Sequence, residues 1–162
     1  RLNAGCNGGN MATAMEYVQN EGGLCSEAEY PYKAKGGSCQ AGSCGTKYDA
    51  IKGHTQVTAD SESAMMSAVD EGCVSIAIEA DQFAFQYYSS GVLDGTCGTN
   101  LDHGVLLVGY GTYTNGEEYW KVKNSWGASW GMDGYILICR DCGKNGKEGE
   151  CGILEDGVYP SA

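Results

Sequence analysis

The stretch Leu101–Gly111, "LDHGVLLVGYG", places one of the two histidines of the chain at the start of an apolar run. Residues 104–110 are continuously apolar apart from glycine. This pattern predicts a strand buried on both faces, with His103 at its mouth. A lone histidine at a strand end is more often a hydrogen-bonded core residue than a reactive group. The role of His103 therefore has to be decided by other parts of the chain.

Asn124 stands at the end of a second candidate strand, residues 118–124, where polar and apolar residues alternate. If the two strands are neighbours, the side-chain oxygen of Asn124 accepts a hydrogen bond from one ring nitrogen of His103 and fixes its tautomer. Trp126 would cover this pair and exclude water. The other ring nitrogen would face a cleft, so the pair forms the base-and-orienter half of a nucleophilic site that lacks its nucleophile. His54 has no comparable context and is expected at the surface.

Periodicity predicts an α+β fold in which short helices come first and a set of antiparallel strands follows. Met11, Ala14, Met15 and Val18 have helical spacing after a possible cap at Asn10. Residues 24–50 are predicted to be loop. The change of period near residues 50–55 predicts a domain boundary. The expected helices and strands are helices 10–20 and 61–71 and strands 74–80 (alternating), 104–110, 118–124 and 134–139 (alternating).

The chain has 162 residues, 42% of them apolar, and a net charge of −11. This length and composition predict a packed core. The acidic balance opposes binding to nucleic acid and to anionic membranes, so neither is expected as a partner. No apolar run approaches the roughly 18 residues that cross a bilayer.

The nine cysteines indicate an oxidising compartment, and their odd number leaves at least one of them free or paired outside the chain. Cys139 and Cys142 have C-x-x-C spacing. A zinc site would need a second such pair or a histidine pair nearby, and a redox motif would need a strand-to-helix context. Neither is present, so disulfide or loop cysteines are favoured, and no metal or cofactor is predicted.

Taken together, the motifs of the chain resemble those of the papain-like cysteine peptidases, and within them the cathepsin L-like group. The resemblance extends along essentially the whole chain, in family order. It rests on "GCNGG" (5–9), "YPY" (30–32), "LDHGV" (101–105), "GYGT" (109–112), "KNSWGASWG" (123–131), "GYI" (134–136) and "CGI" (151–153).

The resemblance implies a two-domain fold with a helical left domain and an antiparallel, β-barrel-like right domain. Residues 1–52 would be the remainder of an incomplete left domain, and residues 53–162 the right domain. His103 would be the imidazole that pairs with a catalytic thiolate, and Asn124 would orient it. Trp126 would shield that contact and Trp130 would pack along the primed side of the cleft, with simple core packing as the alternative for both tryptophans.

The resemblance also assigns the substrate cleft. A substrate wall would consist of Asn7, Gly8 and Gly9, where glycine allows close approach of an extended peptide backbone. Asp102 would flank the mouth of the cleft. The pocket for the second residue before the cut would be lined by Met11, Ala77, Leu101 and Gly104, with Asp156 at its floor.

Asp156 motivates the hypothesis that this pocket accepts Arg or Lys as well as Leu or Phe, because a carboxylate pairs with a cationic side chain. Two alternatives remain open. Asp156 turns to solvent, or a one-residue slip places Leu154 or Gly157 at the floor of the pocket.

The chain departs from the family in its nucleophile. The family cysteine lies in a C-G-[SA]-C-[WY] run that precedes the histidine by about 130 residues or more. This chain has no such run. Cys25 is a decoy for which a disulfide or a buried thiol is expected. The resemblance pairs Cys97 with Cys151 and leaves Cys6 and Cys39 to bond a missing N-terminal segment or a second chain.

The expected function is therefore cysteine-type peptide hydrolysis, with peptide or protein substrates, protein inhibitors of the family as further partners, and a lysosomal, vacuolar or secreted location. The chain alone is expected to be inactive and poorly stable. Two alternatives stay open: a non-catalytic relative with a binding or assembly role, and a secreted disulfide-rich binding domain.

Overall fold

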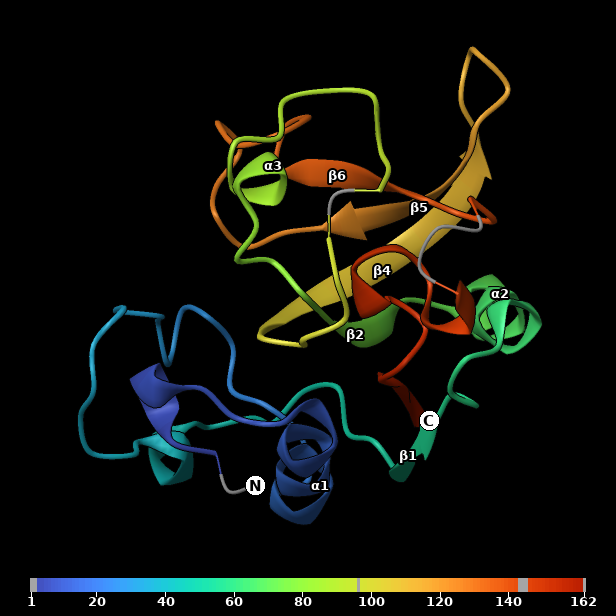
Figure 1. Ribbon diagram of the computed structural model, residues 1–162. Helices are drawn as coiled ribbons and strands as arrows, with labels where there is room; N and C mark the ends of the chain where they lie inside the picture. Colours follow the sequence, from blue (N-terminus) through green and yellow to red (C-terminus); the bar gives the residue numbers. More distant parts are fainter. Residues whose placement is uncertain (1–2, 96, 143–145, 162) are drawn as a thin grey trace. The chain divides into compact units, whose positions relative to one another are not determined.

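The computed structural model describes residues 3–95, 97–142 and 146–161 (Figure 1). The chain divides into two compact units. The first comprises the described residues up to Thr55 together with Pro160 and Ser161, and the second runs from Gln56 to Tyr159.

The first unit contains one α-helix, α1 (Met11–Glu21), between short 3-10 turns at Gly5–Asn7 and Ala41–Ser43. Asn10 caps the helix as predicted, because its side-chain oxygen accepts a hydrogen bond from the Thr13 N–H at 3.1 Å. Gly22 ends the helix in the left-handed conformation with φ 72°, which glycine adopts without steric cost. No residue of α1 is buried.

The loop predicted over residues 24–50 is closed by two cross-links within this unit. Leu24 and Tyr48 form an isolated antiparallel bridge, and Cys25 and Cys44 form a disulfide. Several large apolar side chains of the unit remain exposed, namely Tyr17, Leu24, Tyr30, Tyr32 and Tyr48.

Seven strands form one sheet with the order β1-β7-β2-β4-β5-β6-β3. Pairs β2–β4, β2–β7, β4–β5 and β5–β6 are antiparallel, whereas β3 pairs with β6 in parallel. Within the described residues the sheet is open, with β1 and β3 as its end strands. The strand bounds are β1 (Gly53–Gln56), β2 (Val74–Ile78), β3 (Val92–Leu93), β4 (His103–Thr112), β5 (Glu118–Lys123), β6 (Tyr135–Cys139) and β7 (Gly157–Ser161).

Burial of the strands differs from the sequence prediction in two places. Strand β4 is not buried on both faces: Val105 and Leu107 are buried, while Leu106 between them is only half-buried. The sequence predicts alternation in β6, but residues 136–139 are all buried. The reason is position, because β6 lies between β5 and β3 and the Leu137 N–H donates to the hydroxyl of the buried Tyr88.

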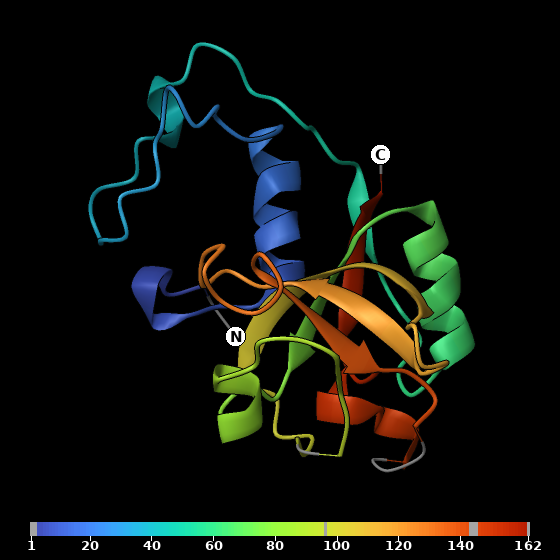
Figure 2. The same cartoon turned by 90° about the horizontal axis from the view of Figure 1, so that it is seen from above.

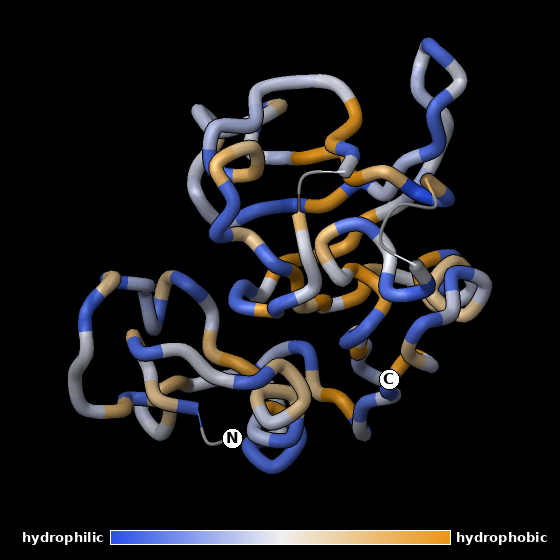
Figure 3. Tube along the Cα trace, viewed as in Figure 1, coloured by the Kyte–Doolittle hydropathy of each residue, from blue (hydrophilic) through white to orange (hydrophobic). Residues whose placement is uncertain are grey.

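Two helices flank the sheet of the second unit, α2 (Glu62–Glu71) and α3 (Phe83–Gln86), and Figures 1 and 2 show them on opposite sides of it. Ser61 caps α2, whose Met65 and Ala68 are buried. Short 3-10 turns cover Gly146–Glu148 and Glu150–Gly152. Figure 3 shows hydrophobic residues gathered along the central strands and a hydrophilic tip on the turn between β4 and β5.

The α+β class and both predicted helices are confirmed, and the four predicted strands agree within two residues. The sequence patterns missed β1, β3 and α3, which are too short to show a period, and β7, in which Gly157 and Pro160 interrupt the pattern. His54, expected at the surface, is half-buried in β1. Among the described residues, no helix combines the length and apolarity that a membrane span requires.

Arg140 is a buried cation of the second unit. Its guanidinium nitrogens lie 2.9 Å from Glu62 and 2.9 Å from Glu118. The guanidinium also lies over the Tyr110 and Trp120 rings, at 5.3 and 5.7 Å from their centroids. Two carboxylates and two aromatic faces thus compensate for the water that Arg140 loses.

Glu155 is an acid held in an unfavourable setting. Its Oε1 is buried and has no hydrogen-bond partner among the described residues. Burial raises the pKa of the Glu155 carboxyl, and the negative charges of Asp60 and Glu148 raise it further. Ionisation of Glu155 therefore opposes folding.

We predict that Glu155→Gln increases the free energy of unfolding at pH 7 more than at pH 4. The pKa of Glu155 is higher in the folded state than in the unfolded state, so its ionisation costs stability as the pH rises through that pKa. Chemical denaturation at the two pH values measures the difference, and Glu71→Gln, at an exposed position, is the control. An equal effect of Glu155→Gln at both pH values would contradict the prediction.

Candidate active site

His103 and Asn124 lie together because β4 and β5 are antiparallel neighbours. His103 is the first residue of β4 and Asn124 directly follows the last residue of β5. The register pairs Leu106 with Lys123, so the start of one strand meets the end of the other. His103 Nε2 and Asn124 Oδ1 are 2.9 Å apart, which is a hydrogen-bond distance.

The second partner of Asn124 Oδ1 decides where the histidine proton lies. This oxygen also accepts the Ser125 backbone N–H at 2.8 Å. That contact fixes the orientation of the amide, because only the oxygen end can accept. Since Oδ1 only accepts, His103 Nε2 must donate and carries a proton. Nδ1 is then the ring nitrogen that can exchange a proton with a reacting group.

Asn124 is itself buried, and its Nδ2 has no hydrogen-bond partner among the described residues. A buried amide that keeps one unpaired donor costs free energy. Two donors thus fix Asn124 Oδ1, whereas Nδ2 makes no hydrogen bond to the described residues.

An aromatic cluster supports the histidine ring. The Trp126 ring centroid lies 5.2 Å from that of His103, and the Trp126 side chain remains 41% exposed. Trp130 meets Trp126 edge-on at 5.3 Å and donates its Nε1–H to the Gln86 carbonyl at 3.0 Å. Trp126 therefore covers one side of the imidazole, and His103 remains half-buried.

Sequence reasoning missed Phe85, which lies at the centre of this cluster. Phe85 is fully buried in α3, and its ring contacts those of Trp126, Trp130 and His103 at 5.6, 5.3 and 6.5 Å. The aromatic run Phe83–Tyr88 was the available signal, but a helix as short as α3 does not reveal which ring faces inward.

Three of the predicted pocket residues are adjacent in the second unit. Ala77 of β2 is paired with Gly104 of β4, and the Ala77 N–H donates to the Asp156 carbonyl at 2.9 Å. The Asp156 carboxylate accepts a hydrogen bond from Gln56 Nε2 at 2.7 Å. Asp156 is half-buried, so it neither points freely into solvent nor lies in the core.

Leu101 and Asp102 precede β4 and hold the loop that leads into it. The carboxylate of Asp102 accepts a hydrogen bond from the Ala80 N–H at 2.8 Å. The backbone N–H of Asp102 donates to the Ile78 carbonyl at 3.0 Å. Leu101 packs so closely on Gly152 that a side chain at Gly152 would collide with it. Asp102 thus has a structural role in addition to the position predicted for it.

The remaining predicted substrate residues belong to the first unit. Asn7 is in the 3-10 turn Gly5–Asn7, and Gly8 follows it with φ 91°, a conformation that favours glycine. A side chain at Gly9 would collide with the carboxamide of Asn3. Met11 is the first residue of α1.

Six cysteines form three disulfides in the described residues, Cys25–Cys44, Cys97–Cys151 and Cys139–Cys142. Cys25, expected to be a disulfide cysteine or a buried thiol, is thus bonded. Cys6, Cys39 and Cys73 are free and exposed.

This fold and this histidine–asparagine pair place the chain among cysteine proteases. The family model "Papain family cysteine protease" matches residues 1–161. The chain belongs to the papain family.

Its relatives are plant cysteine proteases. The chain is 49% identical over 159 residues to "Cysteine endopeptidase Rep1" of Oryza sativa subsp. japonica, covering 98% of this chain and 42% of the relative. It is 48% identical over 158 residues to "Vignain" of Ricinus communis, covering 98% of this chain and 43% of the relative. The chain thus spans less than half the length of these relatives.

Solved structures show the same fold. The bromelain protease of Ananas comosus, in complex with the E64 inhibitor, superposes with a TM-score of 0.92 at 44% identity. The match covers 98% of this chain and 72% of the bromelain chain. A recombinant stem bromelain precursor gives a TM-score of 0.92 at 43% identity, covering 98% of this chain and 51% of the precursor.

We predict that Phe85→Ala lowers the free energy of unfolding by about 3–5 kcal/mol, because it removes a fully buried ring from the aromatic cluster. Phe83→Ala, at the other end of the same short helix, should change it by less than about 0.5 kcal/mol, as is usual at exposed positions. The Phe83 side chain is 75% exposed. Chemical denaturation followed by tryptophan fluorescence measures both variants. Equal losses would show that Phe85 does not support the cluster.

Proposed function

We propose that the protein containing this chain is a cysteine-type endopeptidase, and that this chain supplies its histidine base and its orienting asparagine. The observation that carries the proposal is the hydrogen bond from His103 Nε2 to Asn124 Oδ1, because it fixes the ring and frees Nδ1 for proton exchange. Trp126, against the same ring, limits the water that reaches the pair.

The chemistry follows from this arrangement. His103 Nδ1 takes the proton of a thiol, and the resulting imidazolium stabilises the thiolate. The thiolate attacks a peptide carbonyl carbon, and Nδ1–H then protonates the leaving amine as the C–N bond breaks. Water, deprotonated by Nδ1, hydrolyses the acyl-enzyme, releases the acid and restores the thiol.

The nucleophile of this reaction lies outside these residues. Six cysteines are bonded, and Cys73 directly precedes β2, at the end of that strand remote from His103. His103 is paired with Ile78, the last residue of β2. Cys73 is therefore one strand length away, which at about 3.3 Å per residue is roughly 16 Å. Cys6 and Cys39 lack the flanking residues of the family nucleophile, which supports a thiol on a preceding segment or on a second chain.

Cys6 and Cys39 are the proposed attachment points of that segment. Both are free and exposed in the first unit. The apolar side of α1, which has no buried residue, and the exposed tyrosines of the unit give the segment a surface to cover. For this reason the chain alone is expected to be inactive and poorly stable.

The substrates of the proposed enzyme are extended peptides, and protein inhibitors that mimic them would bind the same cleft. Asn7, Gly8 and Gly9 would contact the peptide backbone, and Trp130 would border the primed side. Met11, Ala77, Leu101 and Gly104 would line the pocket for the second residue before the cut. The disulfides support a lysosomal, vacuolar or secreted location.

Asp156 would extend the specificity of that pocket to Arg and Lys. Its carbonyl accepts the Ala77 N–H, which supports its position next to the pocket wall. Gln56 Nε2 donates to one carboxylate oxygen and leaves the other to pair with a cationic substrate.

We predict that His103→Ala lowers kcat/KM of the intact protein on a peptide substrate by about 10²- to 10⁴-fold. His54→Gln should leave kcat/KM within about twofold, because His54 lies in β1 and has no role in the proposed reaction. The two variants are compared in the same hydrolysis assay. Comparable losses in both would remove the basis for the proposed role of His103.

The same preparations locate the nucleophile when they are treated with a thiol-directed epoxide and mapped by mass spectrometry. The proposal requires one labelled cysteine that is not among the nine of this chain. Labelling of Cys6, Cys39 or Cys73 alone would refute the external nucleophile. No labelled cysteine in a folded protein would instead support a non-catalytic relative with a binding role.

We predict that Asp156→Ala lowers kcat/KM for Arg-Arg substrates by about tenfold, with Phe-Arg and Leu-Arg substrates little changed, because a charge-assisted hydrogen bond is lost. Gln56→Ala serves as the control, since it removes the neighbour of Asp156 and keeps the carboxylate. Hydrolysis rates on the three substrates measure the preference. An unchanged preference in Asp156→Ala would refute the role of Asp156.

A further inference from the structure

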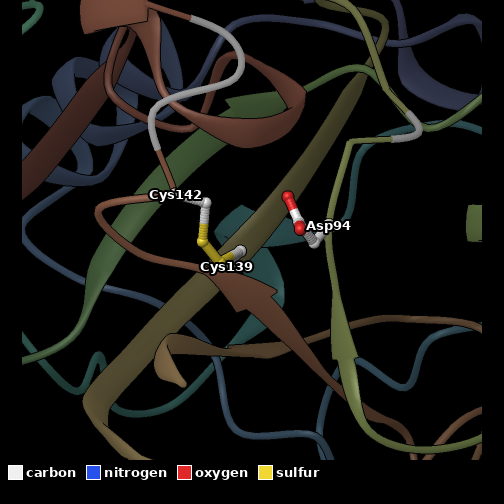
Figure 4. Close-up of side chains that lie close together, drawn as sticks. All are labelled: Asp94, Cys139 and Cys142. Carbon is white, nitrogen blue, oxygen red and sulfur yellow. A yellow bond between two sulfur atoms is a disulfide. The ribbon is translucent and has the colours of Figure 1, made fainter. Parts of the chain in front are cut away.

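Asp94, Cys139 and Cys142 form a cluster that the proposed peptidase chemistry does not use. Figure 4 shows their side chains close together, with the two sulfurs joined in the Cys139–Cys142 disulfide. The sulfurs and a carboxylate oxygen of Asp94 all lie within 4.8 Å of one another. Cys139 is buried, and Cys142 and Asp94 are half-buried.

The parallel pairing of β3 with β6 creates this cluster. Leu93, the last residue of β3, is paired with Ile138, so the next residues along the two strands are Asp94 and Cys139. Cys142 returns to Cys139 through the short connection Arg140–Asp141, in which Asp141 has φ 57°. Residues far apart in the sequence thus meet through sheet register, which no sequence pattern indicates.

We propose that, when the Cys139–Cys142 disulfide is reduced, the two cysteines and Asp94 bind one thiophilic divalent cation such as Zn²⁺. An external dithiol reduces this disulfide by supplying two electrons and two protons. Cys139 and Cys142 become thiols, and the dithiol is oxidised to a disulfide. The cation then displaces both thiol protons and bonds to the two thiolates and to a carboxylate oxygen of Asp94.

The geometry suits such an ion. Two thiolates bound tetrahedrally to zinc at about 2.3 Å are about 3.7 Å apart, so the sulfurs need only separate from bonding distance to non-bonded contact. A two-residue spacer between cysteines is the shortest of the usual zinc-ligand spacings. A carboxylate oxygen of Asp94 lies within 4.8 Å of both sulfurs, so a small movement of this side chain would make it the third ligand. A water molecule would complete four-coordination.

The charges around the cluster favour a cation. Cys139 and Cys142 line a cavity together with four acidic residues, Asp60, Glu62, Asp141 and Glu150, and one basic residue, Lys147. Lys147 is paired with Asp60 at 2.7 Å, and Arg140 is paired with Glu62 and Glu118. Both cations are therefore neutralised, and the remaining field is negative.

A second group of this kind in the described residues, Cys97, Glu150 and Cys151, does not support the same inference. All three residues are buried, and Glu150 Oε1 already accepts the Cys97 N–H at 3.1 Å. The Cys139 cluster differs because Cys142 and Asp94 are partly accessible, which gives a reductant and an ion a route to the site.

The test is titration of the intact protein with Co²⁺, whose thiolate complexes absorb in the near ultraviolet. The protein is first reduced with dithiothreitol, which is then removed under anaerobic conditions. The reduced wild type should bind one more equivalent than the double variant Cys139→Ser/Cys142→Ser. The unreduced wild type should show no such absorption.

Asp94 is tested by two variants and one control. Asp94→Asn should raise the Kd of the additional site at least tenfold, and Asp94→Glu should restore most of the affinity because it keeps a carboxylate. Asp141 lies between the two cysteines and lines the same cavity but is not a ligand. Asp141→Asn removes one nearby charge and no ligand, so it should change the Kd by less than about threefold. The left-handed backbone at Asp141 suits asparagine, so this control keeps the local fold.

Three results would overturn the proposal. They are equal Co²⁺ binding by the reduced wild type and the double serine variant, an unchanged Kd in Asp94→Asn, and loss of the near-ultraviolet circular dichroism of the wild type on reduction. The last result counts against the proposal because the site requires β3 and β6 to stay in register.

Discussion

The hydrogen bond between His103 and Asn124 depends on the antiparallel pairing of β4 with β5, since that register alone brings the start of one strand to the end of the other. A slip of β5 by one residue would turn Asn124 to the face of the sheet opposite His103. The register is held by the pairing of β4 with β2 on its other side and by the buried Val105, Leu107 and Val122. The polar pair of the site is thus fixed by apolar packing.

Packing also sets the surroundings of the imidazole. Phe85 has no polar group, yet its buried ring contacts both Trp126 and Trp130, and Trp126 in turn lies against His103. Because Phe85 and Trp130 hold the Trp126 ring, Trp126 has few alternative rotamers. Trp126 therefore supports the His103 ring in a single orientation. The aromatic cluster and the Asn124 hydrogen bond therefore restrict different motions of the histidine.

The two proposed sites, the peptidase site at His103 and the cation site at Cys139 and Cys142, lie at different strand ends of the same sheet. His103 lies where β4 begins, next to the end of β2, whereas Cys139 lies where β6 ends, next to the end of β3. The proposed peptidase reaction requires a thiol beside His103, and the proposed cation site requires the Cys139–Cys142 pair to be reduced. Because different strand ends build the two sites, each can be altered by substitution without changing a residue of the other.

The sequence by itself determined the α+β class, the helices α1 and α2, the strands β2, β4, β5 and β6, and the papain-family resemblance. Periodicity, caps and ordered motifs are local features of a chain. It also singled out His103 and Asn124, which stand at strand ends. Only the tertiary structure decided that residues 136–139 of β6, rather than β4, are buried in succession, that Phe85 centres the aromatic cluster, and that Asp94 lies close to Cys139 and Cys142. The burial of a strand and the contacts between distant residues depend on which strands are neighbours in the sheet. No single segment of the chain determines that strand order.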